Sequence, residues 1–426
     1  MTDSVKKTEY YYIGISGGGT KTIAWAFKLG RFKTQRVALR VSIHKPSNPM
    51  VLDKKIFLET LGWVFRLMLQ KIRRAESSRP YTIGRPFRIL SIGLALAGAK
   101  NMSNELKTSL SDELYAVQKA VFGSLYYNRN HNTVELNPLI EQKFPIDIQT
   151  DASGTLATYF KRDDKGIVLI AGTGSVCILG NGRGEILKQA GGLGWFLSDE
   201  GSAFWIAKRI LRYVLELDQD NISDEGNHLL NEILCNFGIP KEKDSRQRLL
   251  AYLNQSGAAN RSNIATVAEL VSRQLNSFDQ NDQSQILLIF KKAGRELRKL
   301  INKVLANRNE IDDISKLPII LEGGVFNAWR MIHDGLDPER ELKFYIPNPN
   351  TLAFSGNGYY CLVDGKYKNL VPDAGIGAAR LGLLAWSAAE NSCYYTSEDD
   401  KDLQKMVEDE LDDLDALSSL IRIEKK

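Results

Sequence analysis

The sequence predicts an α/β protein made of two domains. The chain has 426 residues, which is too long for one ordinary hydrophobic core. A pattern of strand, glycine turn and strand occurs twice, at residues 11–30 and 166–181. Other segments have either the long apolar runs of buried strands or the periodicity of helices. Chain length, the repeated hairpin and the mixture of strands and helices together favour two α/β domains.

The first half of the chain begins with the hairpin, at residues 9–30, whose turn has the sequence GGGTK. Residues 54–75 then place Ile56, Leu61, Val64, Phe65 and Leu69 at helical spacing. Residues 87–99 predict a buried strand that ends in small residues. Residues 144–160 predict a strand, Asp151 at a turn, and a helix.

The second half begins with the other hairpin, whose turn has the sequence GTGS. Helical patterns fill residues 203–308, and a third strand runs into Gly323 and Gly324 before a helix. The remaining segments predict an irregular insertion or a hairpin at 335–370, a glycine-rich helix start at 373–386, and an acidic helix at 402–421 with Leu403, Val407, Leu411, Leu414, Leu417 and Ile421 on one face.

The composition is that of an ordinary soluble protein, with 43% hydrophobic and 25% charged residues. No apolar run approaches the length of a membrane span, and the N-terminus lacks the apolar core of a signal peptide. We therefore expect a cytoplasmic protein that does not contact membranes. The four cysteines are far apart, without a CxxC motif or a histidine at ligand spacing. We expect reduced, buried thiols and no structural metal.

The formal net charge of +5 is unevenly distributed along the chain. Residues 397–426 hold eleven acids and five Lys or Arg residues, a net of −6, so residues 1–396 carry +11. A basic body is compatible with nucleic-acid binding, but no Lys/Arg block, aromatic–basic alternation or nucleic-acid motif accompanies it. We expect no nucleic-acid partner and a surface that favours anionic substrates. The acidic tail either packs on the first domain or binds a basic partner.

The glycine turns indicate phosphate binding. Glycine allows the backbone to approach phosphate oxygens closely, and a turn can direct several N–H groups at one anion. One glycine-rich hairpin turn is weak support, because such turns are common. Two of them in similar halves of the chain, together with the EGG turn at 322–324, predict a nucleotide whose phosphates are bound from both sides.

These motifs also carry a family resemblance. GGGT at 17–20, TDASG at 150–154, GTGS at 172–175, GGLGWFLSDEGSAFWIA at 191–207 and GG at 323–324 resemble the N-acetylglucosamine kinase and BadF/BcrA-type ATPase family. This family is part of the sugar kinase, actin and heat-shock ATPase superfamily. The resemblance covers most of residues 10–390, without the insertions at about 101–145 and 335–370.

The resemblance implies two ribonuclease-H-like, actin-like ATPase domains that face each other across a deep cleft. The expected divisions are an N-terminal domain at 1–163, a C-terminal domain at 164–390 and an acidic helical tail at 391–426. The ligands implied are ATP, with Mg²⁺ held through ATP rather than by direct protein ligands, and a sugar. The sequence leaves open whether the chain forms a homodimer.

The resemblance also implies residue roles. Asp151 matches the aspartate that acts as base toward the sugar hydroxyl. The ATP-binding positions are Gly18, Gly19, Thr20, Lys21, Thr173, Gly174, Ala265, Gly323 and Gly324. The sugar-binding positions are Asn48, Asp151, Ser175, Gly192, Gly194 and Asp199.

The two aspartates also have structural interpretations. A carboxylate placed between a buried strand and a helix is positioned to accept a proton from a hydroxyl. The same position suits a helix N-cap, so Asp151 has that alternative role. Asp199 and Glu200 are likewise candidate caps for a helix that begins near Ser202.

Five positions depart from the family pattern. Ser16 replaces the acidic residue that helps to hold hydrated magnesium, and Lys100 stands where relatives usually carry an aspartate. Leu193, Val176 and Ser198 replace a tryptophan, a polar amide and a glycine. Replacing two carboxylates by a hydroxyl and an ammonium should weaken magnesium recruitment, although a lysine can neutralise phosphate charge directly.

Three functions are compatible with this pattern. The first is an ATP-dependent kinase for the 6-hydroxyl of N-acetylglucosamine or a related amino sugar, which the retained Asp151 and GTGS turn favour. The second is a pseudokinase that senses sugar or nucleotide, which Ser16, Lys100 and the acidic helix favour. The third is an ATPase that activates another enzyme, but no cysteine lies in a glycine-rich setting suited to the iron–sulfur cluster of such activators.

Overall fold

The computed structural model divides the chain into two compact units. Unit 1 contains residues 1–165, 180–185 and 347–421, and unit 2 contains residues 166–179, 186–346 and 422–426. The structure describes residues 9–18, 21–30, 36–76, 87–122, 125–128, 133–136, 143–216, 227–242, 244–256, 261–306, 317–339, 342, 344–346, 359–363, 366–369, 374–388, 399–416 and 421–422.

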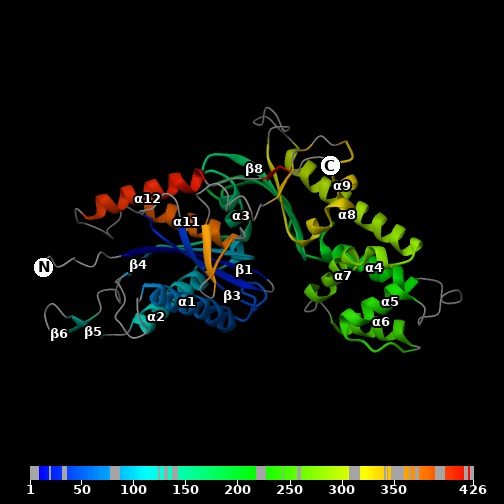
Figure 1. The fold of residues 1–426 in the computed structure, drawn as a ribbon, viewed down its shortest axis with the longest axis horizontal. Helices are drawn as coiled ribbons and strands as arrows, with labels where there is room; N and C mark the ends of the chain where they lie inside the picture. Colours follow the sequence, from blue (N-terminus) through cyan, green and yellow to red (C-terminus); the bar gives the residue numbers. More distant parts are fainter. Residues whose placement is uncertain are drawn as a thin grey trace. The chain divides into compact units, whose positions relative to one another are not determined.

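Unit 1 is built on a seven-stranded sheet with the strand order β14-β13-β3-β2-β1-β4-β7 (Figure 1). Its strands are β1 (Glu9–Gly17), β2 (Thr22–Lys28), β3 (Arg36–Ile43), β4 (Phe87–Leu96), β7 (Ile146–Thr150), β13 (Tyr359–Val363) and β14 (Lys366–Asn369). β1, β2 and β3 are antiparallel neighbours, whereas β1, β4 and β7 run parallel. A separate hairpin pairs β5 (Leu125–Asn128) with β6 (Thr133–Leu136).

Helices cover both faces of this sheet. One face packs on α1 (Lys54–Glu76) and α2 (Asn104–Phe122). The other packs on α11 (Ala374–Ala388) and α12 (Asp399–Ala416), and α3 (Asp151–Tyr159) follows β7 (Figure 1). α1 buries Leu61, Val64, Phe65 and Leu69 as the spacing predicts, but Ile56 is half exposed. Its neighbour Phe57 is directed into the core instead.

Unit 2 contains a six-stranded sheet with the order β10-β9-β8-β11-β12-β15. The strands are β8 (Lys165–Ala171), β9 (Ser175–Asn181), β10 (Ile186–Gly191), β11 (Ile319–Glu322), β12 (Phe344–Ile346) and β15 (Ile421–Arg422). The helices are α4 (Ala203–Glu216), α5 (His228–Phe237), α6 (Ser245–Ser256), α7 (Arg261–Arg273), α8 (Gln280–Leu305) and α9 (Trp329–Leu336). β11 runs parallel to both β8 and β12.

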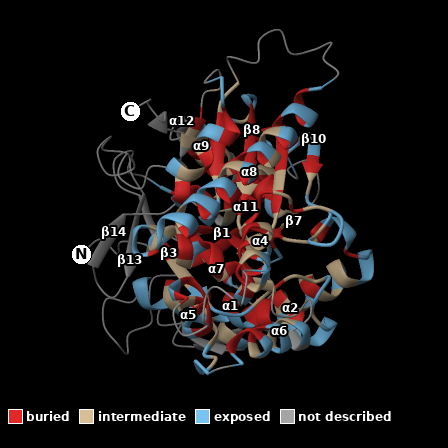
Figure 2. Cartoon of the chain, turned by 90° about the vertical axis from the view of Figure 1, so that its right-hand side faces the viewer, coloured by how far each residue is buried: buried red, intermediate tan, exposed pale blue. Residues whose placement is uncertain are grey.

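The two sheets share one topology. If the strands of each unit are numbered from its first strand, β3-β2-β1-β4-β7 and β10-β9-β8-β11-β12 both have the order 3-2-1-4-5. In both, the first strand pairs with a parallel fourth strand. This confirms the expected fold class, because the chain consists of two ribonuclease-H-like α/β domains. Buried residues concentrate on the strands and on the inner helix faces (Figure 2).

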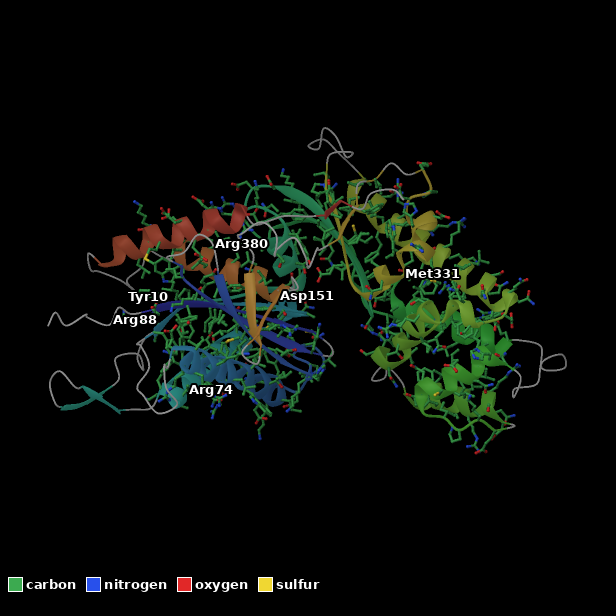
Figure 3. The ribbon with its side chains drawn as sticks, in the orientation of Figure 1. Tyr10, Arg74, Arg88, Asp151, Met331 and Arg380 are labelled. Carbon is green, nitrogen blue, oxygen red and sulfur yellow. The ribbon has the colours of Figure 1, made fainter. Side chains whose placement is uncertain are left out.

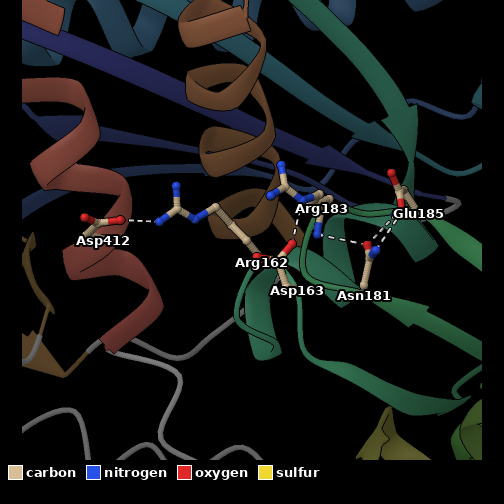
Figure 4. A network of polar contacts seen from close by, with 6 residues as sticks. All are labelled: Arg162, Asp163, Asn181, Arg183, Glu185 and Asp412. Carbon is tan, nitrogen blue, oxygen red and sulfur yellow. Dashed lines mark hydrogen bonds and ion pairs between the residues drawn. The ribbon is translucent and has the colours of Figure 1, made fainter. Parts of the chain in front are cut away.

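The acidic tail forms part of the unit 1 core. On α12, Leu403, Val407 and Leu411 are buried against α11 and the sheet. The buried Glu410 accepts a hydrogen bond of 2.7 Å from the Tyr12 hydroxyl on β1. Arg162, which follows α3, pairs with Asp412 on α12 (Figure 4). Packing on the first domain, one of the two alternatives for the tail, is therefore what the structure shows.

The structure corrects, or selects between, three expectations from the sequence. The acidic helix ends at Ala416 rather than 421, and Ile421 belongs to strand β15. Within the segment 335–370, β13 and β14 form an antiparallel hairpin, which is one of the two forms expected there. Cys235 is exposed on α5, whereas buried thiols were expected. The apolar side chains of α5 at 229, 230, 233 and 234 face the core and leave position 235 on the outer face.

The glycine-rich helix α11 lies in unit 1, whereas residues 374–388 were expected in the C-terminal domain. It packs on β1, β4 and α3. A Cβ at Gly93 on β4 would lie 1.6 Å from the carbonyl oxygen of Ala378. A Cβ at Gly377 would lie 1.8 Å from the carbonyl oxygen of Gly154 on α3. These glycines allow helix and strand backbones to contact one another directly.

Candidate functional site

In unit 1, the carboxyl ends of three parallel strands lie at one level of the sheet. Gly17 at the end of β1 pairs with Leu96 at the end of β4, and Leu96 pairs with Thr150 at the end of β7. The segments that follow these strands begin with Gly18, with a turn at Gly98, and with Asp151. In open α/β sheets, ligands bind outside the carboxyl ends of the strands. We call this edge the unit 1 edge.

Asp151 is the first residue of α3 and does not serve as its cap. The cap is Thr150, whose Oγ1 accepts a hydrogen bond of 3.1 Å from the N–H of Ser153. The Asp151 carboxylate accepts a hydrogen bond of 3.0 Å from the N–H of the adjacent Ala152. Asp151 is solvent-exposed. Figure 3 labels it at the start of α3. The capping alternative for Asp151 is therefore wrong, and the carboxylate is available to a ligand.

The electrostatic environment of Asp151 suits a general base. Desolvation by the surrounding protein raises the pKa of the Asp151 carboxyl above its ordinary value, and the hydrogen bond from Ala152 partly opposes this change. Since the side chain keeps an exposed surface, the desolvation comes from nearby protein rather than from enclosure. A higher pKa makes the carboxylate a stronger proton acceptor.

Buried contacts fix the far end of the same helix. The guanidinium of Arg380 on α11 donates hydrogen bonds of 3.1 and 2.6 Å to the carbonyl oxygens of Ala157 and Phe160 (Figure 3). These carbonyls belong to the last turn of α3, where a cation is also favoured by the helix dipole. Arg380 is itself buried. Asp151 therefore stands on a helix that is held at both ends.

Asn48 lies in a loop bound to the first glycine turn. The N–H of Ser47 donates a hydrogen bond of 3.0 Å to the carbonyl of Gly18. Asn48 Oδ1 accepts a hydrogen bond of 2.9 Å from the N–H of Met50. A Cβ at Gly98, which has φ of 86°, would lie 2.7 Å from that same Oδ1. Asn48 is thus part of the unit 1 edge, and its Nδ2 has no partner among the described residues.

Unit 2 has a corresponding edge at the carboxyl ends of β8 and β11. Ile170 pairs with Glu322, and the two glycine turns follow at 172–174 and 323–324. Gly323 has φ of 110°, and a Cβ there would lie 2.3 Å from the carbonyl oxygen of Ala171. The two turns are therefore neighbours, and only glycine fits at position 323. We call this edge the unit 2 edge.

Three glycines, one in the first glycine turn of unit 1 and one in each turn of the unit 2 edge, expose bare backbone to open space. A Cβ added at Gly18, Gly172 or Gly324 would meet no atom within 4 Å, and none of the three has a positive φ. Neither packing nor backbone conformation within the chain requires glycine at these positions. Close approach of a ligand would require it, and phosphate groups are bound in this way by backbone N–H groups.

Hydrogen bonds from three segments hold the GTGS turn. The N–H of Ala203, at the start of α4, donates to the carbonyl of Gly172 at 2.8 Å, and the N–H of Gly192 donates to the carbonyl of Ser175 at 3.0 Å. The N–H of Ser175 donates to Asp199 Oδ1 at 3.0 Å. Thr173, at the tip of the turn, is half-buried. The turn that would hold phosphates is therefore fixed by the loop that precedes α4.

Asp199 is a buried and strained residue. Its φ is 69°, and it is the one non-glycine residue with a positive φ in the described part of the chain. Only 4% of its surface is exposed, and burial raises the pKa of its carboxyl. Ser202 Oγ caps α4 by accepting from the N–H of Trp205 at 3.2 Å. The capping alternative for Asp199 and Glu200 is therefore wrong.

The other predicted positions are distributed over the same two edges. Ala265 is buried on α7, which packs against the 3-10 helix η5 (Gly324–Ala328). Lys21, which follows the first glycine turn, is exposed. In the loop after β10, Gly192 is exposed and Gly194 has a φ of 85°. Gly19 and Thr20 lie outside the described residues. Their roles, like those of the other site residues, remain predictions.

Three of the five departures from the family pattern lie at these edges or in the loop before α4. Ser16 is the penultimate residue of β1, and Lys100 is exposed in the 3-10 helix η1 (Ala99–Asn101) that follows β4. Leu193 is 69% exposed in the loop before α4. In the residues that the structure describes, no group of three or more His, Cys, Asp or Glu side chains is arranged to hold a metal ion. No helix in the same residues is long and apolar enough to cross a membrane.

Sequence reasoning missed three residues of these edges. They are Ser47, Gly98 and Arg261, whose guanidinium lies 3.7 Å from Asp199 Oδ2. Gly98 is visible in the sequence as the first glycine after a buried strand, the same pattern that identified the two hairpin turns. Ser47 and Arg261 have no comparable signal, because they reach the edges only through folding.

A comparison with protein families identifies the chain. The sequence profile of the BadF/BadG/BcrA/BcrD ATPase family matches residues 13–349, which is most of the sequence. The chain belongs to this family. The family resemblance of the glycine turns is thereby confirmed.

Individual relatives are more distant. An N-acetyl-D-glucosamine kinase of Dictyostelium discoideum is 25% identical over 342 residues, which are 80% of this chain and 92% of that protein. An N-acetylmuramic acid/N-acetylglucosamine kinase of Clostridium acetobutylicum is 28% identical over 192 residues, which are 44% of this chain and 57% of that protein. Among solved structures, a ROK hexokinase of Thermus thermophilus has a TM-score of 0.38 and 14% identity, covering 90% of this chain and 100% of its own.

Proposed function

We propose that this protein is an ATP-dependent kinase that phosphorylates the 6-hydroxyl of N-acetylglucosamine or a related amino sugar. The observation that carries the proposal is the Asp151 carboxylate. It is exposed, is not used as a helix cap, and stands on a buttressed helix at the carboxyl edge of a ribonuclease-H-like sheet. Membership of an ATPase family and the two kinase relatives support the same reaction.

In the proposed reaction, each edge has a main task, although predicted ATP-binding residues such as Gly18 also lie at the unit 1 edge and predicted sugar-binding residues such as Asp199 at the unit 2 edge. Asn48 and Asp151 at the unit 1 edge would bind the sugar, and Asp151 would accept the proton of the attacking hydroxyl. The backbone N–H groups of the GTGS turn and Thr173 would bind phosphate oxygens, and Gly323 and Gly324 would lie along the adenosine. Phosphoryl transfer depends chiefly on positioning and on neutralising charge, which these groups supply.

Magnesium would reach this site with ATP. The carboxylate-poor unit 1 edge, where Ser16 and Lys100 stand, suits a metal that is held by phosphate oxygens and water rather than by protein carboxylates. When bound, the ion would offset negative charge on the phosphates. Lys21 and Lys100, both exposed, are two cations of the chain itself at this edge.

The test is ATP consumption by the purified protein with a panel of hexoses and amino sugars, with and without magnesium. Asp151→Asn should abolish sugar-dependent turnover and leave sugar binding largely intact, because shape is kept and the base is removed. Asp147→Asn is the matched control. Asp147 lies on β7, its pKa is also raised by burial, and its carboxylate accepts from Gln149 at 3.0 Å. If the Asp151 variant keeps turnover within about tenfold of the parent, Asp151 is not the base.

The pH profile gives a second readout. A general base acts in its deprotonated form, so turnover should fall as pH decreases through the pKa of Asp151. Because desolvation raises that pKa, the fall should occur above the ordinary range of aspartate, about 3.9.

A sensor without catalytic activity is the second candidate, and one observation favours it. Ser16 and Lys100 occupy an edge where relatives of this type carry carboxylates, so magnesium recruitment would be weak. A protein that binds ATP and an amino sugar in calorimetry, but consumes no ATP with any sugar at saturating magnesium, would have this function.

A further inference from the structure

The ion pair between Arg261 and Asp199 takes no direct part in the proposed phosphoryl transfer. Arg261 is the first residue of α7, and its guanidinium is 3.7 Å from Asp199 Oδ2. The other oxygen of the same carboxylate, Oδ1, accepts the N–H of Ser175 at 3.0 Å. The carboxylate therefore connects a partly exposed cation with the backbone of the GTGS turn.

This carboxylate also contacts the turn from a second direction. A Cβ at Gly174 would lie 2.9 Å from both oxygens of Asp199, so the carboxyl group packs directly on the backbone of the turn. Asp199 has a left-handed backbone, a conformation that costs free energy in a residue other than glycine and persists only where surrounding contacts fix it. Asp199 thus helps to fix Gly174 and Ser175, together with the hydrogen bonds that Ser175 forms with Gly192 and Glu200.

A buried carboxylate needs compensation to stay ionised. Asp199 is 4% exposed, and an isolated charge at such a position would be replaced by the neutral acid. The Arg261 guanidinium favours ionisation, and so does the hydrogen bond from Ser175, whereas the neighbouring Glu200 carboxylate opposes it. Arg261 is the one cation that forms an ion pair with Asp199 among the described residues.

We propose that Arg261 is a positioning residue for nucleotide binding: it keeps Asp199 ionised, and the ionised carboxylate holds the GTGS turn in the conformation that receives phosphate. The inference rests on the proposed function insofar as it places the nucleotide phosphates at this turn. It assigns to Asp199 a structural task toward the nucleotide in addition to the predicted contact with the sugar.

The experiment measures ATP binding by calorimetry, without sugar and across a pH series. Arg261→Gln should weaken ATP binding on the order of tenfold, because the charge-assisted hydrogen bond to Ser175 loses its support. The affinity of this variant should also fall, as pH decreases, at a higher pH than in the parent, because loss of the cation raises the pKa of Asp199. Protonation of ATP itself also changes the affinity with pH, but this change is the same for the parent and the variant. Arg261→Lys should restore much of the affinity, since it restores the charge.

The control lies at the other end of the same helix. Arg273 is the last residue of α7, is largely exposed, and pairs with Glu269 at 2.5 Å. Arg273→Gln should leave the affinity and its pH dependence unchanged. Asp199→Asn, whose amide tolerates a left-handed backbone, should weaken ATP binding at every pH. Adding Arg261→Gln to it should have little further effect.

The outcomes separate this inference from the proposed function. If the parent binds ATP and Arg261→Gln binds it equally well at every pH, the positioning role is wrong and the kinase proposal stands. An equal loss of affinity at all pH values, accompanied by a lower melting temperature and no rescue by lysine, would make Arg261 merely structural. If the parent does not bind ATP at all, the proposed function fails first.

Discussion

Gly17→Ala tests how tightly the first glycine turn is joined to the loop that carries Asn48. Gly17 is the last residue of β1 and is buried between β2 and β4. A Cβ at this position would lie 1.7 Å from Ser47 Oγ and 3.1 Å from Ser47 Cβ. Its φ is not positive, so the backbone itself accepts alanine. The Cβ would also lie 3.1 Å from Leu96 Cδ2, a contact that a shift of a few tenths of an ångström relieves, so a large effect must come mainly from Ser47.

The magnitude follows from these distances. Real Cβ contacts below 3.0 Å essentially do not occur, so Ser47 Oγ must move away by more than 1 Å. Moving it breaks the buried hydrogen bond of 2.9 Å between Thr22 Oγ1 and Ser47 Oγ. That loss costs about 1–3 kcal/mol, and residual crowding about 1–3 kcal/mol more. The free energy of unfolding of unit 1 should fall by about 2–5 kcal/mol.

A double-mutant cycle isolates the clash. Ser47→Ala alone should cost about 1 kcal/mol, because Thr22 Oγ1 still donates to the carbonyl of Lys45 at 2.8 Å. In the double variant the 1.7 Å contact disappears, so its cost should be smaller than the sum of the single costs by about 1–3 kcal/mol. Gly18→Ala is the matched control and should change stability by less than about 0.5 kcal/mol, since its Cβ would meet nothing within 4 Å.

The assay is urea unfolding with hydrogen exchange of β1 and β2 peptides, which assigns the transition to unit 1. Additive costs for Gly17→Ala and Ser47→Ala, within about 0.5 kcal/mol, would refute the described packing of the Asn48 loop on the glycine turn. So would a Gly18→Ala variant that is as unstable as Gly17→Ala.

Three further predictions concern the sugar, the metal and the tail. Asn48→Ala should weaken amino-sugar binding in calorimetry without altering ATP binding, because it removes a side-chain amide whose Nδ2 has no partner in the described part of the chain; an equal loss for both ligands would make Asn48 a loop-holding residue. Ser16→Asp should raise the kinase rate and lower the magnesium concentration for half-maximal activity. Lys100 could neutralise the new carboxylate, and the double variant with Asp at both positions tests this. Leu411→Ala on α12 should lower the free energy of unfolding by about 2–5 kcal/mol, whereas the exposed Glu408→Ala should not, and equal stability of the two variants would contradict the packing of the tail.

Local patterns in the sequence predicted most elements correctly. Period-two and continuous apolar runs identified β1, β2, β4, β8 and β11, and helical spacing identified α1 and α12. These signals succeed because they arise from the alternation of buried and exposed positions within one element. The glycine turns succeed for a similar reason, since a residue without Cβ signals the same local requirement wherever it occurs.

The sequence could not decide which of several neighbouring side chains caps a helix, or which distant residues form an ion pair. Asp151 and Asp199 both suited a helix cap, and only the structure shows that Thr150 and Ser202 provide the caps. Such a choice depends on which of several nearby acceptors reaches the amide, and that distance is set by packing. Arg261 shows the same limit, since its partner Asp199 is 62 residues away in sequence.

The sequence by itself determined the two-domain α/β class, the phosphate-type turns and the acid at the strand end, because each is encoded within a few consecutive residues. Only the tertiary structure decided that α11 returns to unit 1, that α12 completes its core, and that Gly17 meets Ser47. These contacts join residues distant in the sequence. They form because buried apolar area and close backbone contact stabilise one arrangement of elements, and no local pattern records that arrangement.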